Sequence, residues 1–215
     1  MELLTRNSKI AKSNKRTFNF GIPAYRDAKG FATCPFAKAC VKGCYANAGA
    51  YKFSNVAKAF QARFELTRKP AEFFKAMVSE VKRKRAERVR VHDSGDFYNP
   101  EYLQLWLDIA HACPGVEFYA YTKSVSWVKA AQRAGQVPKN FTFVFSFGGR
   151  EDALIDKAKD RHAWVFSSTE AMLQAGYVDT NETDDNAADP AIQRIGLVYH
   201  GTKKLENTDW EKVAA

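Results

Sequence analysis

The chain has 215 residues, of which 46% are hydrophobic, so it can bury the core of one domain and is too apolar for a disordered protein. No run approaches the roughly 20 apolar residues of a membrane helix, and the N-terminus lacks the apolar stretch of a signal peptide. The net charge of +9 suits contact with polyanions. We therefore expect a cytoplasmic protein without membrane contact, whose thiols stay reduced.

From residue 16 onward, short runs of β-branched and aromatic residues alternate with longer segments of helical period. This alternation is typical of a parallel sheet with crossover helices, and it predicts an α/β fold, a partial, open, parallel βα barrel of about six strands. The expected strands are 17–22, 88–92, 116–121, 141–147, 162–166 and 195–200. The expected helices are 54–68, 71–85, 100–112, one from Ser124 or Ser126 to Arg133, 151–159 and 169–175.

The chain divides into regions of different composition. We expect a single domain, 1–215, made of an N-terminal extension, 1–15, a barrel core, 16–176, an acidic loop, 179–190, and a C-terminal strand and tail, 191–215. The acidic segment lacks apolar periodicity, which predicts a mobile loop near the mouth of the barrel. Within the core, Asn99 fits the N-cap of a helix that begins at Pro100.

The first expected strand is followed by three of the four cysteines, Cys34, Cys40 and Cys44, which lie within eleven residues. The carboxyl ends of parallel strands are where α/β folds place their sites. Cys113 instead ends a helix before the third strand, at the opposite end of the sheet, so we expect a buried structural thiol there. The three clustered thiols predict a metal or cluster site.

Two identities of this site stay open. Zinc held by the three cysteines and His92 is one, although zinc sites usually pair closely spaced cysteines, and here five and three residues separate them. A [4Fe-4S] cluster fits at least as well, because thiolates are its standard ligands and three of them leave one iron open. Three thiols without a metal form a third interpretation, which the sensitivity of clustered thiols to oxidants disfavours.

A basic block, 82–85, closes the helix 71–85, and Arg88 and Arg90 follow it. Cations near a helix C-terminus are favourable through the helix dipole alone, so a solvated helix end explains the block. The other interpretation is a basic surface that binds nucleic acid or an anionic ligand.

Polar residues follow the other expected strands and should meet the cysteines at the same rim, where we expect them to bind a small molecule. They are Asp93, Ser94, Gly95 and Asp96 after the second strand, Lys123 after the third, Ser146 at the end of the fourth and Ser167 after the fifth. Alternatively, Asp96 is a turn carboxylate, Lys123 is solvated and the serines satisfy backbone groups. For His92 and His200 the alternatives are a core histidine, a donor to a ligand, or a ligand.

The order of elements resembles radical S-adenosylmethionine enzymes. The three-cysteine loop ends in Gly43-Cys44-Tyr45, and the turn Ser94-Gly95-Asp96 follows the second strand. Those enzymes have a partial barrel and a CxxxCxxC loop, whereas the spacing here is five and three. The resemblance implies a [4Fe-4S] cluster whose open iron binds S-adenosylmethionine, with Asp96 or Asp93 accepting its ammonium group. No glycine-rich adenine-binding segment follows the fifth strand.

Further stretches, spread over about residues 17–170, are similar to the gene product 88 family of phage and plasmid proteins. They are 34–46, 94–97 with Tyr102 and Trp106, and 118–124. This resemblance implies an iron-sulfur protein of phage origin, located in the host cytoplasm, and implies no reaction. Two functions stay open. One is an enzyme that resembles radical S-adenosylmethionine enzymes; the other is a non-catalytic cluster or zinc protein with a redox-sensing or nucleic-acid-binding role.

Overall fold

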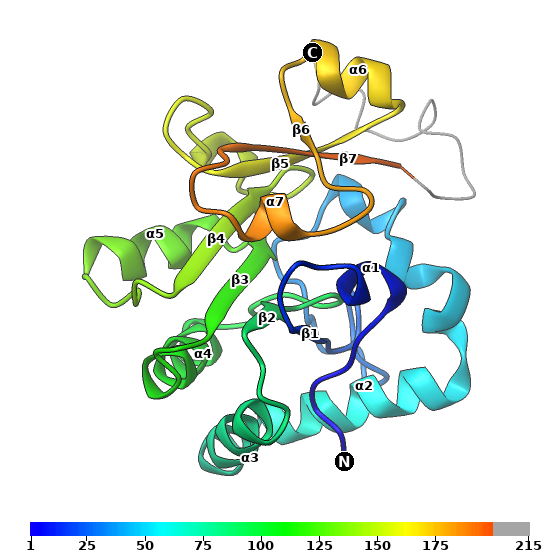
Figure 1. Ribbon diagram of the computed structural model, residues 1–215. Helices are drawn as coiled ribbons and strands as arrows, with labels where there is room; N and C mark the ends of the chain where they lie inside the picture. The colour runs from blue at the N-terminus through cyan, green and yellow to red at the C-terminus, as the bar shows by residue number, and fades with distance from the viewer. Residues whose placement is uncertain (200–215) are drawn as a thin grey trace.

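The computed structural model describes residues 1–199. Within them, seven strands form one parallel sheet of order β1-β2-β3-β4-β5-β7-β6, which curls into an open half-barrel (Figure 1). The expected partial βα barrel is thereby confirmed. The strands are β1 Thr17–Phe20, β2 Arg88–Val91, β3 Glu117–Thr122, β4 Phe141–Ser146, β5 His162–Phe166, β6 Val178–Asp179 and β7 Arg194–Val198. The short β6 was not predicted, and His200 lies outside the described residues.

The longer helices agree closely with the predicted ranges. They are α2 Ser54–Thr67, α3 Pro70–Arg83, α4 Pro100–Ala112, α5 Val125–Arg133 and α6 Thr169–Gln174. Shorter elements are α1 Ser8–Ala11, α7 Asp185–Ala188, and the 3-10 turns η1 Ala39–Val41, η2 Tyr45–Asn47, η3 Gly49–Lys52 and η4 Asp152–Leu154. Among residues 1–199, no helix is both long and apolar enough to cross a bilayer.

The helix expected at 151–159 is wrong, because only η4 forms there. The Asp152 carboxylate accepts hydrogen bonds from the backbone N–H groups of Gly148 and Gly149, each at 2.9 Å. Asp156 accepts one from Ala158 in the same way. Side chains that bind nearby backbone donors compete with helix formation, so the segment forms turns.

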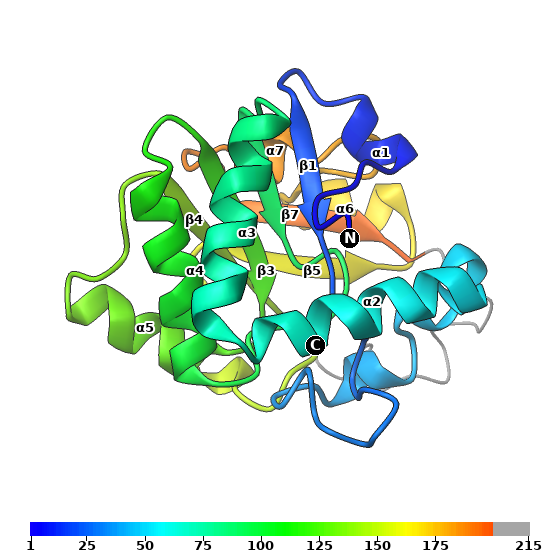
Figure 2. The same cartoon turned by 90° about the horizontal axis from the view of Figure 1, so that it is seen from below.

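The outer face of the sheet is apolar and carries most of the core. Helices α2, α3, α4 and α5 lie along this face (Figure 2). Alternate strand residues point to the same side of a sheet, so every second residue of the strands packs against these helices. They include Phe18, Phe20, Val89, Val91, Phe118, Ala120, Phe141, Phe143 and Phe145. Full burial of each large apolar side chain contributes about 2 kcal/mol.

The inner, concave face is mainly polar in β1, β2 and β3. The strand residues between the apolar positions include Thr17, Asn19, Arg88, Arg90, Glu117, Tyr119 and Tyr121. On this side, Ala187 and Ala188 of α7 pack against Tyr119 and Val144. The alternation predicts two faces of different character, and the curl of the sheet makes one of them the interior of the half-barrel.

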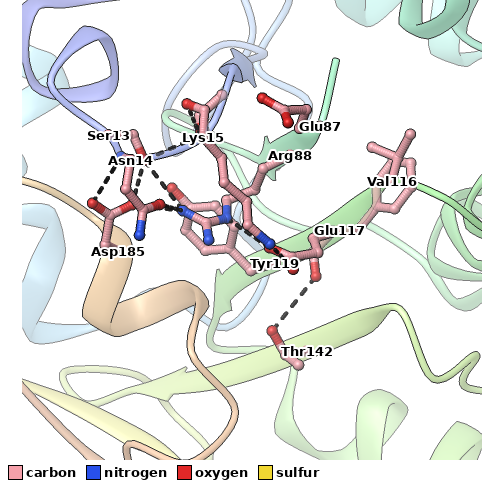
Figure 3. A network of polar contacts seen from close by, with 12 residues as sticks. Ser13, Asn14, Lys15, Glu87, Arg88, Val116, Glu117, Tyr119, Thr142 and Asp185 are labelled. Atoms are coloured by element: carbon pink, nitrogen blue, oxygen red, sulfur yellow. Dashed lines mark hydrogen bonds and ion pairs between the residues drawn. The ribbon is translucent and has the colours of Figure 1, made fainter. Parts of the chain in front are cut away.

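A polar network fills the interior at the beginning of β2 and β3 (Figure 3). Arg88 donates to Asp185 Oδ1 at 2.6 Å and to Glu117 Oε2 at 2.9 Å. Ser13 donates to Asp185, and Lys15 pairs with Glu117. The N-terminal segment, predicted as an extension, is therefore joined to the strands and to α7.

The segment 179–190, expected to be a mobile loop without regular structure, contains the end of β6 and α7. Its Asp184 is only 2% exposed and forms ion pairs with Lys9 and Arg90, each at 2.6 Å. The segment lacks apolar periodicity because it packs against the interior through carboxylates that meet buried cations, with only two alanines in contact with the core.

Candidate functional site

A cavity of about 420 Å³ lies at the carboxyl ends of the strands. Eight of the ten predicted site residues line it: Cys34, Cys40, Cys44, Ser94, Gly95, Asp96, Lys123 and Ser146. Its volume is within the range of small-molecule sites. Parallel strands bring these loops together, since their carboxyl ends share one edge.

The cysteine loop is held at two places. The backbone N–H groups of Lys38 and Cys40 donate to the carbonyl oxygen of Gly148, beyond β4, at 3.3 and 3.2 Å. On the other side, the Tyr45 hydroxyl donates to the backbone oxygen of Asp93, beyond β2. The loop therefore spans the mouth of the half-barrel from β4 to β2, which places its thiols along the cavity wall.

The thiols share this wall with a half-buried cation, Lys123. Lys123 Nζ donates to Ser146 Oγ at 2.9 Å. Desolvation lowers the pKa of Lys123, but the nearby Cys40, Asp96 and Cys34 outweigh it and raise the pKa. Desolvation and, after it, the Asp96 charge raise the pKa of the Cys34 thiol, which also accepts a hydrogen bond from the Tyr25 backbone N–H. Its neighbours therefore favour the charged form of Lys123 beside the thiols.

The three cysteines supply thiolate donors, which suit a zinc ion or a [4Fe-4S] cluster. Among residues 1–199, no three His, Cys, Asp or Glu side chains are arranged to hold one metal ion. A zinc ion needs its sulfurs to converge at about 2.3 Å from one point. In a [4Fe-4S] cluster the iron atoms are separate, so each thiolate binds a different atom and the sulfurs do not converge on one point.

His92 does not supply a fourth ligand here. Its Nε2 lies 2.9 Å from the Tyr102 hydroxyl, and its ring packs edge-on against Phe97 and Trp106. Burial lowers its pKa to about 3, so the ring is neutral. His92 thus packs as a core histidine whose ring also borders the cavity.

The two aspartates of the turn after β2 differ in role. Asp96 lines the cavity, but its carboxylate accepts from Thr122 Oγ1 at 2.6 Å and from two backbone N–H groups, those of Phe97 and Lys123, at 2.8 Å each. It therefore acts as a turn carboxylate. Asp93 does not belong to the cavity lining; its carboxylate binds the side chains of Asn19 and Tyr51 beneath the cysteine loop.

Gly95 and two of the three predicted serines line the cavity. Gly95 has φ of +85°, and a Cβ there would lie 2.2 Å from Ile22 Cγ1, so the turn itself requires glycine. Ser94 and Ser146 line the cavity, whereas Ser167 is exposed and does not belong to its lining. The structure therefore brings together all predicted residues except Asp93 and Ser167.

Sequence reasoning missed a second part of the cavity lining. Lys9, Arg90 and Asp184, here called the cavity floor, line it together with Tyr121. The floor includes Arg90, which stacks over the Tyr121 ring at 5.1 Å. The signal was present in the alternation of Arg88-Val89-Arg90-Val91, which puts both arginines on one face of a strand. These arginines lie inside the half-barrel, so the predicted basic surface loses two of its cations.

Comparisons with known proteins agree on one family. A model of the family described as Gene product 88 matches residues 1–213. The chain is 31% identical to the Gene 88 protein of Mycobacterium phage D29 over 212 residues, which cover 92% of the chain and 77% of that protein. It is 32% identical to the Gene 88 protein of Mycobacterium phage L5 over 120 residues, 49% of the chain and 47% of that protein. No solved structure matches the chain. These matches give no support to a resemblance to radical S-adenosylmethionine enzymes.

Proposed function

The chain belongs to the Gene product 88 family, and we propose that it is an iron-sulfur protein that binds a [4Fe-4S] cluster through Cys34, Cys40 and Cys44. The observation that carries the proposal is that these thiols line one wall of a single cavity. Bound there, the cluster would supply one-electron chemistry and an iron atom without a thiolate ligand. The Lys123 ammonium group lies beside the thiols and favours the more reduced, more negative cluster.

The rest of the cavity is room for a small ligand beside the cluster. S-adenosylmethionine is one candidate, but the wall offers little to its ammonium group. Asp96 already accepts three hydrogen bonds from the protein, and Asp93 does not line the cavity. We therefore leave the ligand open between S-adenosylmethionine and another small molecule.

The test is anaerobic purification followed by assays of iron and acid-labile sulfide. We expect about four of each per chain, and a paramagnetic signal after reduction with dithionite. Replacing Cys34, Cys40 or Cys44 by alanine should abolish iron binding. Cys113→Ala is the matched control, because that thiol is buried at the C-terminal end of α4 and should leave the iron content unchanged.

The alternatives give different results. Zinc without iron would favour the zinc protein, and iron that survives all three cysteine variants would refute the assignment of ligands. A reduced signal that shifts on adding S-adenosylmethionine would identify it as the ligand of the open iron. A signal that ignores it would point to another ligand or to a redox role.

A further inference from the structure

We propose that the cavity floor, Lys9 and Arg90 with Asp184, binds the anionic group of a small molecule, either a carboxylate or a phosphate. This deepens the proposed function by giving the chemical class of the ligand that shares the cavity with the cluster. The anion site itself does not depend on the cluster, because no floor residue belongs to the cysteine loop. Only the contact between the ligand and the open iron rests on the proposed function.

The floor holds two cations and one carboxylate. Asp184 pairs through Oδ2 with Arg90 and through Oδ1 with Lys9, each at 2.6 Å, so two cations share one carboxylate at contact distance. Asp179 also acts on Lys9, and Asp93 on Arg90, but within residues 1–199 neither forms an ion pair with the floor. The Tyr119 hydroxyl also donates to Asp184, at 3.1 Å. Since Asp184 is only 2% exposed, the protein itself already surrounds it.

The two cations still reach the cavity. The side chains of Lys9 and Arg90 are 24% and 12% exposed, and both residues line the cavity. An ammonium group has three N–H donors and a guanidinium has five, so one carboxylate cannot use them all. Desolvation and the neighbouring Arg90 charge lower the pKa of Lys9, and the attraction of Asp184 and Asp179 does not fully offset them. An anion in the cavity would complete the compensation.

The neighbouring hydroxyl groups do not supply that anion. Tyr45 and Tyr51 both line the cavity, but each donates to Asp93, one to its backbone oxygen and the other to its carboxylate. Nearby, Asn181 accepts from the Val198 backbone N–H. None of these groups carries a negative charge, so the anionic partner that we propose for the floor comes from a ligand.

The rest of the cavity lining bears on the body of the molecule. Arg90 pairs in register with Tyr119, four residues before Lys123 on the neighbouring strand. The floor and Lys123 therefore start from different levels of the sheet and line different parts of the cavity. Apolar side chains of Val165 and Leu197 line the same cavity. A molecule with one anionic end and a less polar body fits this arrangement.

The experiment measures binding of inorganic phosphate, acetate and neutral acetamide by isothermal titration calorimetry at constant ionic strength. We use the full chain, both free of iron and as purified anaerobically. We expect phosphate or acetate to bind and acetamide not to bind. A preference for phosphate identifies a phosphate ligand, and a preference for acetate a carboxylate.

Three variants locate the binding. Lys9→Gln removes a floor cation and should weaken binding by about tenfold, equivalent to about 1.4 kcal/mol. Asn7→Asp adds a negative charge to the cavity lining and should weaken it similarly. This variant should fold, because Asn7 caps α1 through its side-chain oxygen and aspartate caps equally well. Lys12→Gln, which removes an exposed lysine next to the same short helix, should leave binding unchanged.

The outcomes are separable from those for the cluster. No binding of either anion, or binding that is equal in all variants, overturns the inference. Anion binding that depends on Lys9 and Asn7 in protein that never takes up iron would sustain the anion site and refute the cluster. A bound cluster in protein that binds neither anion would sustain the cluster and refute the anion site.

Discussion

At the scale of single residues, the turn after β2 places two buried titratable groups side by side. Burial lowers the pKa of His92 from 6.5 to about 3 and raises that of Asp93 from 3.8 to about 6. The neutral form of each is therefore favoured by folding. The stability that His92 contributes is complete above pH 6.5 and is lost as pH falls towards 3. The contribution of Asp93 is complete below pH 3.8 and is lost as pH rises through 6.

Between pH 4 and 6, the contribution of His92 to stability rises with pH and that of Asp93 falls. Removing the Asp93 carboxylate therefore makes the His92 contribution measurable. Asp93→Asn keeps a side-chain oxygen that can accept from Asn19 Nδ2, but has no charge to desolvate. Relative to the unmodified protein, we expect the free energy of unfolding of the variant to rise by about 1.4 kcal/mol per pH unit over this window. Urea denaturation at pH 4, 5, 6 and 7 measures it.

The control is Asp108→Asn, which removes an exposed carboxylate of α4 and should not produce this dependence. A difference between Asp93→Asn and the unmodified protein that is flat with pH would show that Asp93 titrates normally. Its role beneath the cysteine loop would then rest on its hydrogen bonds alone.

At the scale of elements, α4 is a helix whose bounds local sequence patterns predict correctly. Its bounds, Pro100–Ala112, are those predicted from apolar period and from the Asn99-Pro100 start. The Asn99 side chain accepts a hydrogen bond from the Tyr102 backbone N–H at 2.7 Å. The helix then buries Trp106 against the outer face of the sheet and carries the Tyr102 hydroxyl to His92. The helix predicted at 151–159 does not form, because Asp152 accepts hydrogen bonds from backbone N–H groups of the preceding loop. The periodicity of apolar residues does not reveal such contacts.

Asn99→Ala should therefore destabilise the protein by about 1 kcal/mol, because it leaves a helix N–H group without its acceptor. The measurement is the urea midpoint at pH 7. Asn99→Asp is the matched variant, since it retains an acceptor at the same position and should recover most of the loss. Equal stability of Asn99→Ala and the unmodified protein would mean that water satisfies this helix end.

At the scale of the whole molecule, Asp184 joins segments that are far apart in the chain. It pairs with Lys9 of α1 and Arg90 of β2, and accepts from Tyr119 of β3. The desolvation of Asp184 raises its pKa, but Arg90 and Lys9 outweigh this effect and lower it. The charges of the interior thus depend on one another across the half-barrel.

Asp184→Asn leaves two partly buried cations without their carboxylate and should cost about 3 kcal/mol in the free energy of unfolding. Urea denaturation at pH 7 tests it. The neighbouring Asp185→Asn serves as comparison, because the Asp185 side chain is 22% exposed and pairs with Arg88, which retains Glu117. We expect the smaller loss there; equal losses would indicate that burial of Asp184 is not what matters.

The sequence by itself determined the alternation of strands and helices, the end of the sheet that carries the cysteines, and most of the residues around the cavity. These follow from period, caps and chain order, which are local. Only the tertiary structure decided which polar groups are already engaged. Asp96 and Asp93 are carboxylates of the kind that bind ligands. Protein donors already bind the Asp96 carboxylate, and Asp93 lies outside the cavity lining.

The cavity floor is a second feature that local sequence patterns do not reveal. Lys9, Arg90 and Asp184 are separated by up to 175 positions in the chain, and nothing in the spacing of their segments relates them. They meet because the parallel sheet curls, so that its polar face encloses α1 and α7. Local patterns report which face of an element is polar, but the curvature of a sheet comes from the packing of all its strands together.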